Sequence, residues 1–135
     1  MISRSRTAEP VRRRRWLLVD DNEDILALME ATMNQLFGVE SASYHVPGDA
    51  LAAFQAAPDD FQGIITDLEM PAMNGFELCN RLRAVRPGAR VFLATGSHEI
   101  TAAEARERGF CGMLTKPFSA NTLQREITSV WMTAK

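Results

Sequence analysis

The chain has 135 residues, of which 46% are hydrophobic and 24% are charged, and its formal net charge is −2. This length fits one globular domain with a continuous core and is too short for such a domain plus a separate output module. The composition excludes disordered and fibrous classes, and no apolar stretch approaches the ~20 residues that cross a bilayer. We therefore expect a cytoplasmic protein with one functional site and no membrane insertion.

The charge is unevenly distributed along the chain. The first fifteen residues carry six arginines and one glutamate, a charge of +5, which leaves −7 for the remainder. Because these residues lack helical or strand periodicity, residues 1–15 are predicted to be a flexible basic arm or linker, and residues 16–135 the folded domain. A short arginine run is more often a linker than a nucleic-acid or membrane contact. The acidic charge of the folded part argues against direct binding of nucleic acid there.

Predicted strands and helices alternate along the chain. In order they are strand 16–19, helix 23–36, strand 39–44, helix 48–57, strand 61–66, helix 75–85, strand 91–94, helix 99–108, strand 112–114 and helix 119–131. The strands are short β-rich apolar runs, of which 39–44 is the weakest, and the helices show apolar residues at helical spacing. Five strands joined by helix-length crossovers predict an α/β fold, a doubly wound parallel sheet with helices on both faces.

Helical spacing also predicts which residues of helix 23–36 face the core. Six of them share one face: Ile25, Leu28, Met29, Thr32, Met33 and Leu36. The two cysteines, Cys79 and Cys111, lack the spacing of a zinc or thioredoxin-like motif, so we expect reduced structural thiols.

Chemically useful side chains follow the predicted strands. Asp20 and Asp21 follow the first strand, Asp67 the third, Thr95 the fourth and Lys116 the fifth. Because ligands of doubly wound sheets bind outside the carboxyl ends of the strands, these side chains are predicted to share one crevice.

Carboxylates gathered in one crevice repel one another unless a cation lies among them. Mg²⁺ prefers oxygen ligands and is often held by one or two carboxylates, so Asp21 and Asp67 are expected to bind it. Asp20 can bind directly or through a water molecule, and a main-chain carbonyl near Glu69 can add another oxygen. A carboxylate can also attack a phosphoryl group to give an acyl phosphate. Lys116 would then neutralise a phosphoryl oxygen, and Thr95 would donate a hydroxyl hydrogen bond.

Four short motifs resemble the signatures of two-component response-regulator receiver domains. They are Val19-Asp20-Asp21-Asn22, Thr66-Asp67-Leu68-Glu69-Met70-Pro71 with Asn74-Gly75, Thr95-Gly96, and Lys116-Pro117-Phe118. The resemblance implies a flavodoxin-like (βα)5 fold with strand order 2-1-3-4-5, and a signalling module rather than an enzyme. It implies Asp67 as phosphoacceptor, Asp20 and Asp21 as the Mg²⁺ pair, Thr95 and Lys116 as switch residues, and often a cis bond before Pro117.

The same resemblance implies the partners. A histidine kinase or histidine phosphotransfer protein would donate the phosphoryl group, and a downstream target would bind the face formed by the fourth helix, fifth strand and fifth helix. Met113 takes the place where many family members have an aromatic switch residue. Non-aromatic residues at this place, and the Thr95-Gly96-Ser97 turn, are familiar in receivers of hybrid sensor kinases, so that origin and a stand-alone regulator both fit.

Two other functions compete with the phosphorylation switch. The first is a docking module that has the receiver fold and binds its partner without needing phosphorylation, and Met113 is the feature compatible with it. A phosphatase of the haloacid-dehalogenase type would need a second aspartate two positions after the nucleophile, where this chain has Glu69, so it ranks low. Glu69 and Ser97 are interpreted as modulators of the site or as ordinary loop residues, and His45 and His98 as plain loop histidines.

Overall fold

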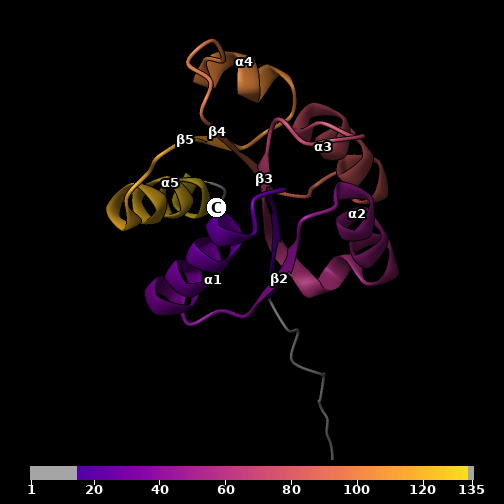
Figure 1. The fold of residues 1–135 in the computed structure, drawn as a ribbon, viewed down its shortest axis with the longest axis horizontal. Helices are drawn as coiled ribbons and strands as arrows, with labels where there is room; N and C mark the ends of the chain where they lie inside the picture. The colour runs from indigo at the N-terminus through magenta and orange to yellow at the C-terminus, as the bar shows by residue number, and fades with distance from the viewer. Residues whose placement is uncertain (1–14, 134–135) are drawn as a thin grey trace, which may run out of the picture.

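The computed structural model describes residues 15–133, so residues 1–14 of the predicted basic arm lie outside the described residues. Five parallel strands form one sheet in the order β2-β1-β3-β4-β5 (Figure 1). The strands are β1 (Arg15–Val19), β2 (Ser41–Tyr44), β3 (Phe61–Asp67), β4 (Val91–Thr95) and β5 (Gly112–Thr115). The predicted fold class and strand order are therefore confirmed.

Helices cover both faces of this sheet. They are α1 (Glu23–Phe37), α2 (Pro47–Ala56), α3 (Gly75–Val85), α4 (Ala102–Glu107) and α5 (Ala120–Thr133), with a short 3₁₀ turn, η1 (Pro58–Asp60), before β3. Figure 1 shows α1 and α5 on one face and α2 and α3 on the other, with α4 beside the β4–β5 edge. Every connection is a helical crossover, which is what parallel neighbouring strands require.

Alternating side chains of the central strands build a separate apolar core on each face. On β3, Ile64 packs in the cluster with residues of α2 and α3, whereas Ile65 packs with residues of α1 and α5. Leu17 and Leu18 on β1 divide in the same way. This division follows from the two-residue period of a strand, and it explains why buried strands read as continuous apolar runs.

The sequence misplaced one core residue and several boundaries. Leu28 was predicted to face the core, but it is 68% exposed, and Leu26 is buried with Met29 and Met33. Because Leu26, Met29 and Met33 are spaced by three and four residues, they share the stripe that packs on the sheet, and Leu28 lies off it. Helix α4 is shorter than the predicted 99–108. Thr101 ends the preceding loop by accepting a hydrogen bond from the Glu104 N–H, 3.0 Å away.

An aromatic cluster closes the end of the sheet opposite the strand carboxyl ends. The Trp131 ring lies 5.5 Å from that of Trp16 and 6.2 Å from that of Phe92. The Trp16 indole covers Gly63 so closely that a Cβ atom there would lie 2.5 Å from the ring. A side chain larger than hydrogen at residue 63 would therefore displace the indole.

Both cysteines are free thiols in this fold. Burial raises the pKa of Cys79 to about 11 and that of Cys111 to about 12, which suits structural rather than reactive thiols. Within residues 15–133, no helix combines the length and apolar character needed to cross a bilayer.

Candidate functional site

The carboxyl edge of the sheet brings the predicted site residues to neighbouring strands. Asp20 follows β1, while Asp67 and Thr95 are the last residues of the adjacent strands β3 and β4. Both strands are one residue longer than predicted, so these two side chains belong to the rigid sheet rather than to loops. Asp20, Asp67 and Thr95 are buried, with 1%, 9% and 2% of their surfaces exposed.

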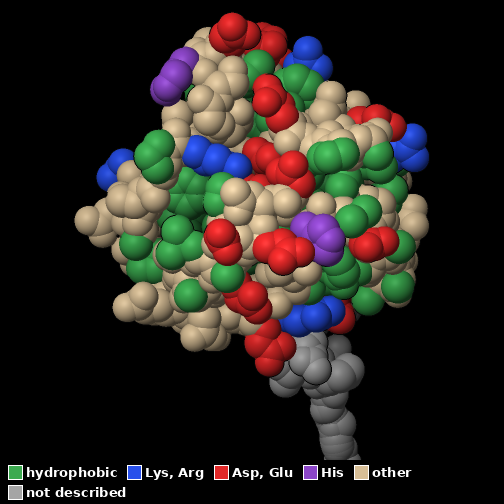
Figure 2. All heavy atoms as spheres, in the orientation of Figure 1, with side chains coloured by type: hydrophobic (Ala, Val, Ile, Leu, Met, Phe, Trp, Pro, Cys, Tyr) green, Lys and Arg blue, Asp and Glu red, His purple; other side chains and the backbone are tan. Residues whose placement is uncertain are grey.

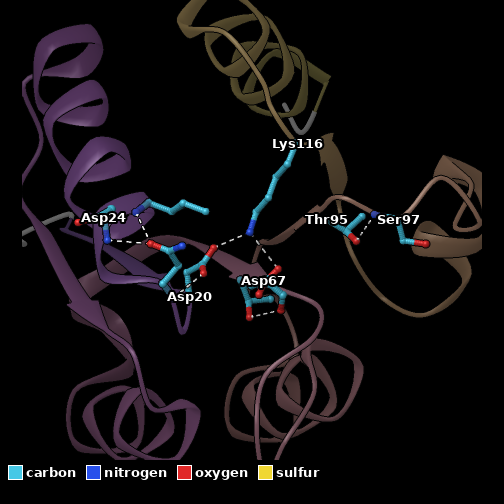
Figure 3. A network of polar contacts seen from close by, with 9 residues as sticks. Asp20, Asp24, Asp67, Thr95, Ser97 and Lys116 are labelled. Atoms are coloured by element: carbon cyan, nitrogen blue, oxygen red, sulfur yellow. Dashed lines mark hydrogen bonds and ion pairs between the residues drawn. The ribbon is translucent and has the colours of Figure 1, made fainter.

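Lys116 bridges two of the acids. Its Nζ donates hydrogen bonds to Asp20 Oδ2 at 2.6 Å and to Asp67 Oδ1 at 3.1 Å. Figure 3 shows the lysine side chain extending from the end of β5 to a point between the two carboxylates. Three segments that are far apart in sequence therefore meet around one ammonium group.

Asp21 completes a cluster of three acids. Asp20, Asp21 and Asp67 each offer a carboxylate oxygen, and these oxygens lie within 4.8 Å of one another. Asp20 has donors on both oxygens, because the Asn22 N–H donates to its Oδ1 at 2.9 Å. Asp21 is exposed. Figure 2 shows several acidic side chains across the middle of the face that it draws. A set made only of carboxylate oxygens fits a hard cation such as Mg²⁺.

The charges of this cluster shift the pKa values of its central pair. Burial raises the pKa of Asp67, as does the neighbouring Asp20 charge, while the hydrogen bond from Lys116 opposes the increase. Burial alone would lower the pKa of Lys116, but its hydrogen bonds to Asp20 and Asp67 and their charges raise it. Lys116 therefore remains an ammonium, and it leaves part of the negative charge of three acids uncompensated.

The turn after β1 explains how two acids stay at the sheet edge. Asn22 caps α1, since its side chain accepts from the N–H groups of Asp24 and Ile25 at 2.9 and 3.1 Å. Its own N–H holds Asp20, as described above. Sequence reasoning did not assign Asn22 this double role, although an asparagine before an acidic helical turn is a typical N-cap signal.

The loop between β3 and α3 is held by a series of tight contacts. The Gly75 N–H donates to the Leu68 carbonyl at 2.7 Å, and a Cβ atom at Gly75 would lie 2.4 Å from the Asp67 carbonyl oxygen. Further along, Ala72 has a φ of 73°, and the Met73 N–H donates to the Pro71 carbonyl at 2.8 Å, as in a γ-turn. These contacts fix the backbone that follows Asp67.

Thr95 lies beside the acidic cluster but is engaged elsewhere. Its Oγ1 accepts a hydrogen bond from the Ser97 N–H at 3.0 Å, and Figure 3 shows Asp67 between this pair and Asp20. Glu69 is exposed in the loop after β3, and Met113 is half-buried against the apolar cluster on the α3 side. The Lys116–Pro117 peptide bond is cis, as the resemblance implied.

A parallel five-stranded α/β fold with clustered acids and a lysine at its carboxyl edge defines a class of protein. Residues 16–128 match the response regulator receiver domain family, and the chain belongs to that family. It is therefore a receiver domain of two-component systems, a signalling module whose family interacts with kinases or phosphotransfer proteins and with output domains.

Individual relatives agree with this assignment. The chain is 35% identical over 108 residues to the C4-dicarboxylate transport transcriptional regulatory protein DctD of Rhizobium meliloti (strain 1021), covering 78% of this chain and 23% of that protein. It is 31% identical over 116 residues to the autoinducer 1 sensor kinase/phosphatase LuxN of Vibrio campbellii (strain ATCC BAA-1116), covering 86% and 13%. The chain thus spans less than a quarter of either relative.

A solved structure supports the fold and the family together. The chemotaxis response regulator CheY4 of Vibrio cholerae superposes with a TM-score of 0.76 at 29% identity, covering 87% of this chain and 98% of that one. The receiver fold thus accounts for nearly all of the residues that the structure describes.

Proposed function

We propose that Asp67 accepts a phosphoryl group from the phosphohistidine of a histidine kinase or phosphotransfer protein, with Mg²⁺ present, and that this modification changes the choice of downstream partner. The observation that carries the proposal is the cluster of Asp20, Asp21 and Asp67 at the edge of the sheet, with the Lys116 ammonium bound to Asp20 and Asp67. Asp67 is the member of this cluster that ends the central strand, so it is held most rigidly.

In the transfer, one carboxylate oxygen of Asp67 forms a bond to phosphorus as the bond from phosphorus to the donor imidazole nitrogen breaks. The electron pair of that bond leaves with the imidazole, and the product on this chain is an acyl phosphate. Asp20, Asp21, Asp67 and the main-chain carbonyl of Glu69 would hold the metal ion. Bound Mg²⁺ would neutralise charge on the carboxylates and the phosphoryl oxygens.

Lys116 and Thr95 supply the remaining contacts. Lys116 already lies 3.1 Å from Asp67 Oδ1, so a small rotation of its side chain brings the ammonium to a phosphoryl oxygen on that residue. Thr95 now accepts from the Ser97 N–H, which leaves its own hydroxyl proton able to donate toward the phosphoryl group. Both residues would then exchange their present hydrogen-bond partners for oxygens of the phosphoryl group.

The downstream face in this proposal is formed by α4, β5 and α5. A hollow of about 510 Å³ lies there, bordered by Arg106 of α4, Met113 of β5 and Glu126 of α5 among others. Movement of Thr95 toward a phosphorylated Asp67 would pull on the loop that leads to α4, a short helix of six residues. Phosphorylation would thus act as a local electrostatic change that alters the position of this short helix.

The proposal is tested with a small phosphodonor. Wild type, Asp67→Ala and the control Asp49→Ala, which removes an exposed acid from the first turn of α2, are incubated with Mg²⁺ and acetyl phosphate. Intact mass spectrometry should show one added phosphoryl group on the wild type and the control and none on Asp67→Ala. An equal mass increase in all three proteins would overturn the proposal.

A second function is favoured by one observation. Met113 stands where many receivers have an aromatic switch residue. Its side chain is partly buried and packs against the apolar core, and it has no aromatic ring that could rotate inward. A docking module that binds its partner regardless of phosphorylation is compatible with this. Equal partner affinity for Asp67→Asn and for wild type treated with beryllofluoride and Mg²⁺ would select this function over the switch.

A further inference from the structure

Thr66 is a polar side chain buried in the middle of the sheet. It is 0% exposed, it lies on the central strand β3, and its register partners are Val19 of β1 and Leu93 of β4. A buried hydroxyl is unfavourable unless it is hydrogen-bonded, and a valine of the same shape would avoid that cost. The partner of the Thr66 hydroxyl is therefore informative.

That partner is the main chain of the phosphoacceptor residue. Thr66 Oγ1 donates to the Asp67 carbonyl oxygen at 2.8 Å. The same oxygen lies against Gly75, where a Cβ atom would be 2.4 Å away, and the Gly75 N–H binds the next carbonyl, that of Leu68, at 2.7 Å. The carbonyl of the last residue of β3 and the one that follows it are thus fixed, the first by the Thr66 side chain and the second by the start of α3.

Fixing two successive carbonyls restricts where the third one can point, because only the two torsions of Glu69 then remain to orient its carbonyl. Each peptide unit is planar, so the chain has only two soft torsions per residue. With the Asp67 and Leu68 peptide units held, few torsions remain to direct the carbonyl of Glu69, the main-chain ligand of the proposed metal site. The Thr66 bond also holds the backbone of Asp67, from which its carboxylate projects.

We propose that Thr66 is a positioning residue for the metal and phosphoryl site, acting through its hydrogen bond to the Asp67 carbonyl. This inference rests on the proposed function and adds a residue to it that touches neither metal nor phosphoryl group. Removal of a group that holds a metal ligand in place without touching the metal typically lowers metal affinity by about 10–100-fold. Because Thr66 acts through the backbone, we expect its hydroxyl to matter at the lower end of this range. Removal of the hydroxyl should weaken Mg²⁺ binding roughly tenfold.

The experiment compares Thr66→Val with Thr66→Ser and a matched control. Thr66→Val keeps the shape and removes the hydroxyl, whereas Thr66→Ser restores a donor. The control is Thr32→Val, because the Thr32 hydroxyl also donates to a main-chain carbonyl, that of Leu28, at the same 2.8 Å, but within α1. Dissociation constants for Mg²⁺ alone are measured by chemical-shift titration, after urea unfolding has shown that each variant is folded.

We expect about tenfold weaker Mg²⁺ binding for Thr66→Val and near wild-type binding for Thr66→Ser and Thr32→Val. If Thr66→Val is unfolded, Thr66→Cys, with a small side chain and only a weak donor, replaces it and should show the same loss. Equal Mg²⁺ affinity in wild type and the variant without the hydroxyl would overturn the role of Thr66 alone. A wild type that binds no Mg²⁺ would remove the proposed function and this inference together.

Discussion

Asp21→Asn should make the metal-free protein more stable. Asp21 carries one of the three carboxylates whose oxygens lie within 4.8 Å of one another, and both hydrogen bonds of Lys116 go to the other two acids. Asparagine at this position therefore removes a repelling charge without depriving the lysine of a partner. The change isolates the electrostatic cost of assembling the cluster.

The size of the effect follows from the geometry. Asp20, Asp67 and Lys116 together present one net negative charge to Asp21. At 4.8 Å, two unit charges repel by about 3.5 kcal/mol with an effective dielectric constant of 20, and by about 0.9 kcal/mol in bulk water. Because Asp21 is exposed, the value for bulk water describes its repulsion better. We therefore expect Asp21→Asn to raise the free energy of unfolding by roughly 1 kcal/mol.

Urea unfolding followed by tryptophan fluorescence measures this difference, since Trp16 is buried in the core. The curves are recorded in EDTA and in excess Mg²⁺. Wild type should gain stability from Mg²⁺, because a ligand that binds only the native state stabilises it, and Asp21→Asn should lose most of that gain. An Asp21→Asn protein that is no more stable in EDTA and keeps the full Mg²⁺ gain would refute the reasoning.

Asp24→Asn is the matched control, an exposed acid three residues away in the first turn of α1. Negative charge there is favourable to the helix dipole, so its removal should cost about 0.5 kcal/mol. Two identical substitutions close together are thus expected to act with opposite sign. Stabilisation by both would show that the net acidity of the chain, rather than the cluster, controls the result.

Three further changes test other parts of the structure. Gly63→Ala places a Cβ atom 2.5 Å from the Trp16 ring and should cost about 1–3 kcal/mol, seen as a lower urea midpoint; an unchanged midpoint would contradict the packing described. Ala72 has a φ of 73°, and Ala72→Gly should relieve about 1–2 kcal/mol of backbone strain. Glycine also increases the entropy of the unfolded chain, which opposes folding by about 0.4–1 kcal/mol. The urea midpoint should therefore rise slightly, and a fall would argue against strain in this turn. The raised pKa of Asp67 means that the native state binds its proton more tightly than the unfolded chain does, so ionised Asp67 costs stability at neutral pH. Asp67→Asn should therefore be more stable than wild type at neutral pH. The difference should close as the pH falls through the native pKa toward the ordinary value of 3.8, and a gap that widens in acid would reverse the sign of this effect.

The sequence predicted the fold because strand and helix patterns are local. Short β-rich runs alternating with helical periodicity required a parallel sheet, and the residues after each run had to meet at its carboxyl edge. The contact of Lys116 with Asp20 and Asp67 agrees with that expectation. The strand order came from the family resemblance, since alternation alone does not fix the order of strands.

What the sequence did not predict depends on three-dimensional packing. The exposure of Leu28 follows from the rotation of α1 on the sheet, which periodicity leaves uncertain by about one position. The contact of Thr66 with the Asp67 carbonyl needs the chain path at the end of β3. The engagement of Thr95 with Ser97 is likewise a property of the loop conformation rather than of residue type.

The central claim is tested most directly by locating the modified residue. After incubation with acetyl phosphate, borohydride converts an aspartyl phosphate to homoserine, which peptide mass spectrometry can place in the chain. We expect homoserine at residue 67 when Mg²⁺ is present and aspartate there when EDTA replaces it. Homoserine at another aspartate, or equal conversion of Asp67 with and without Mg²⁺, would contradict the account of a metal-dependent phosphoacceptor at the end of β3.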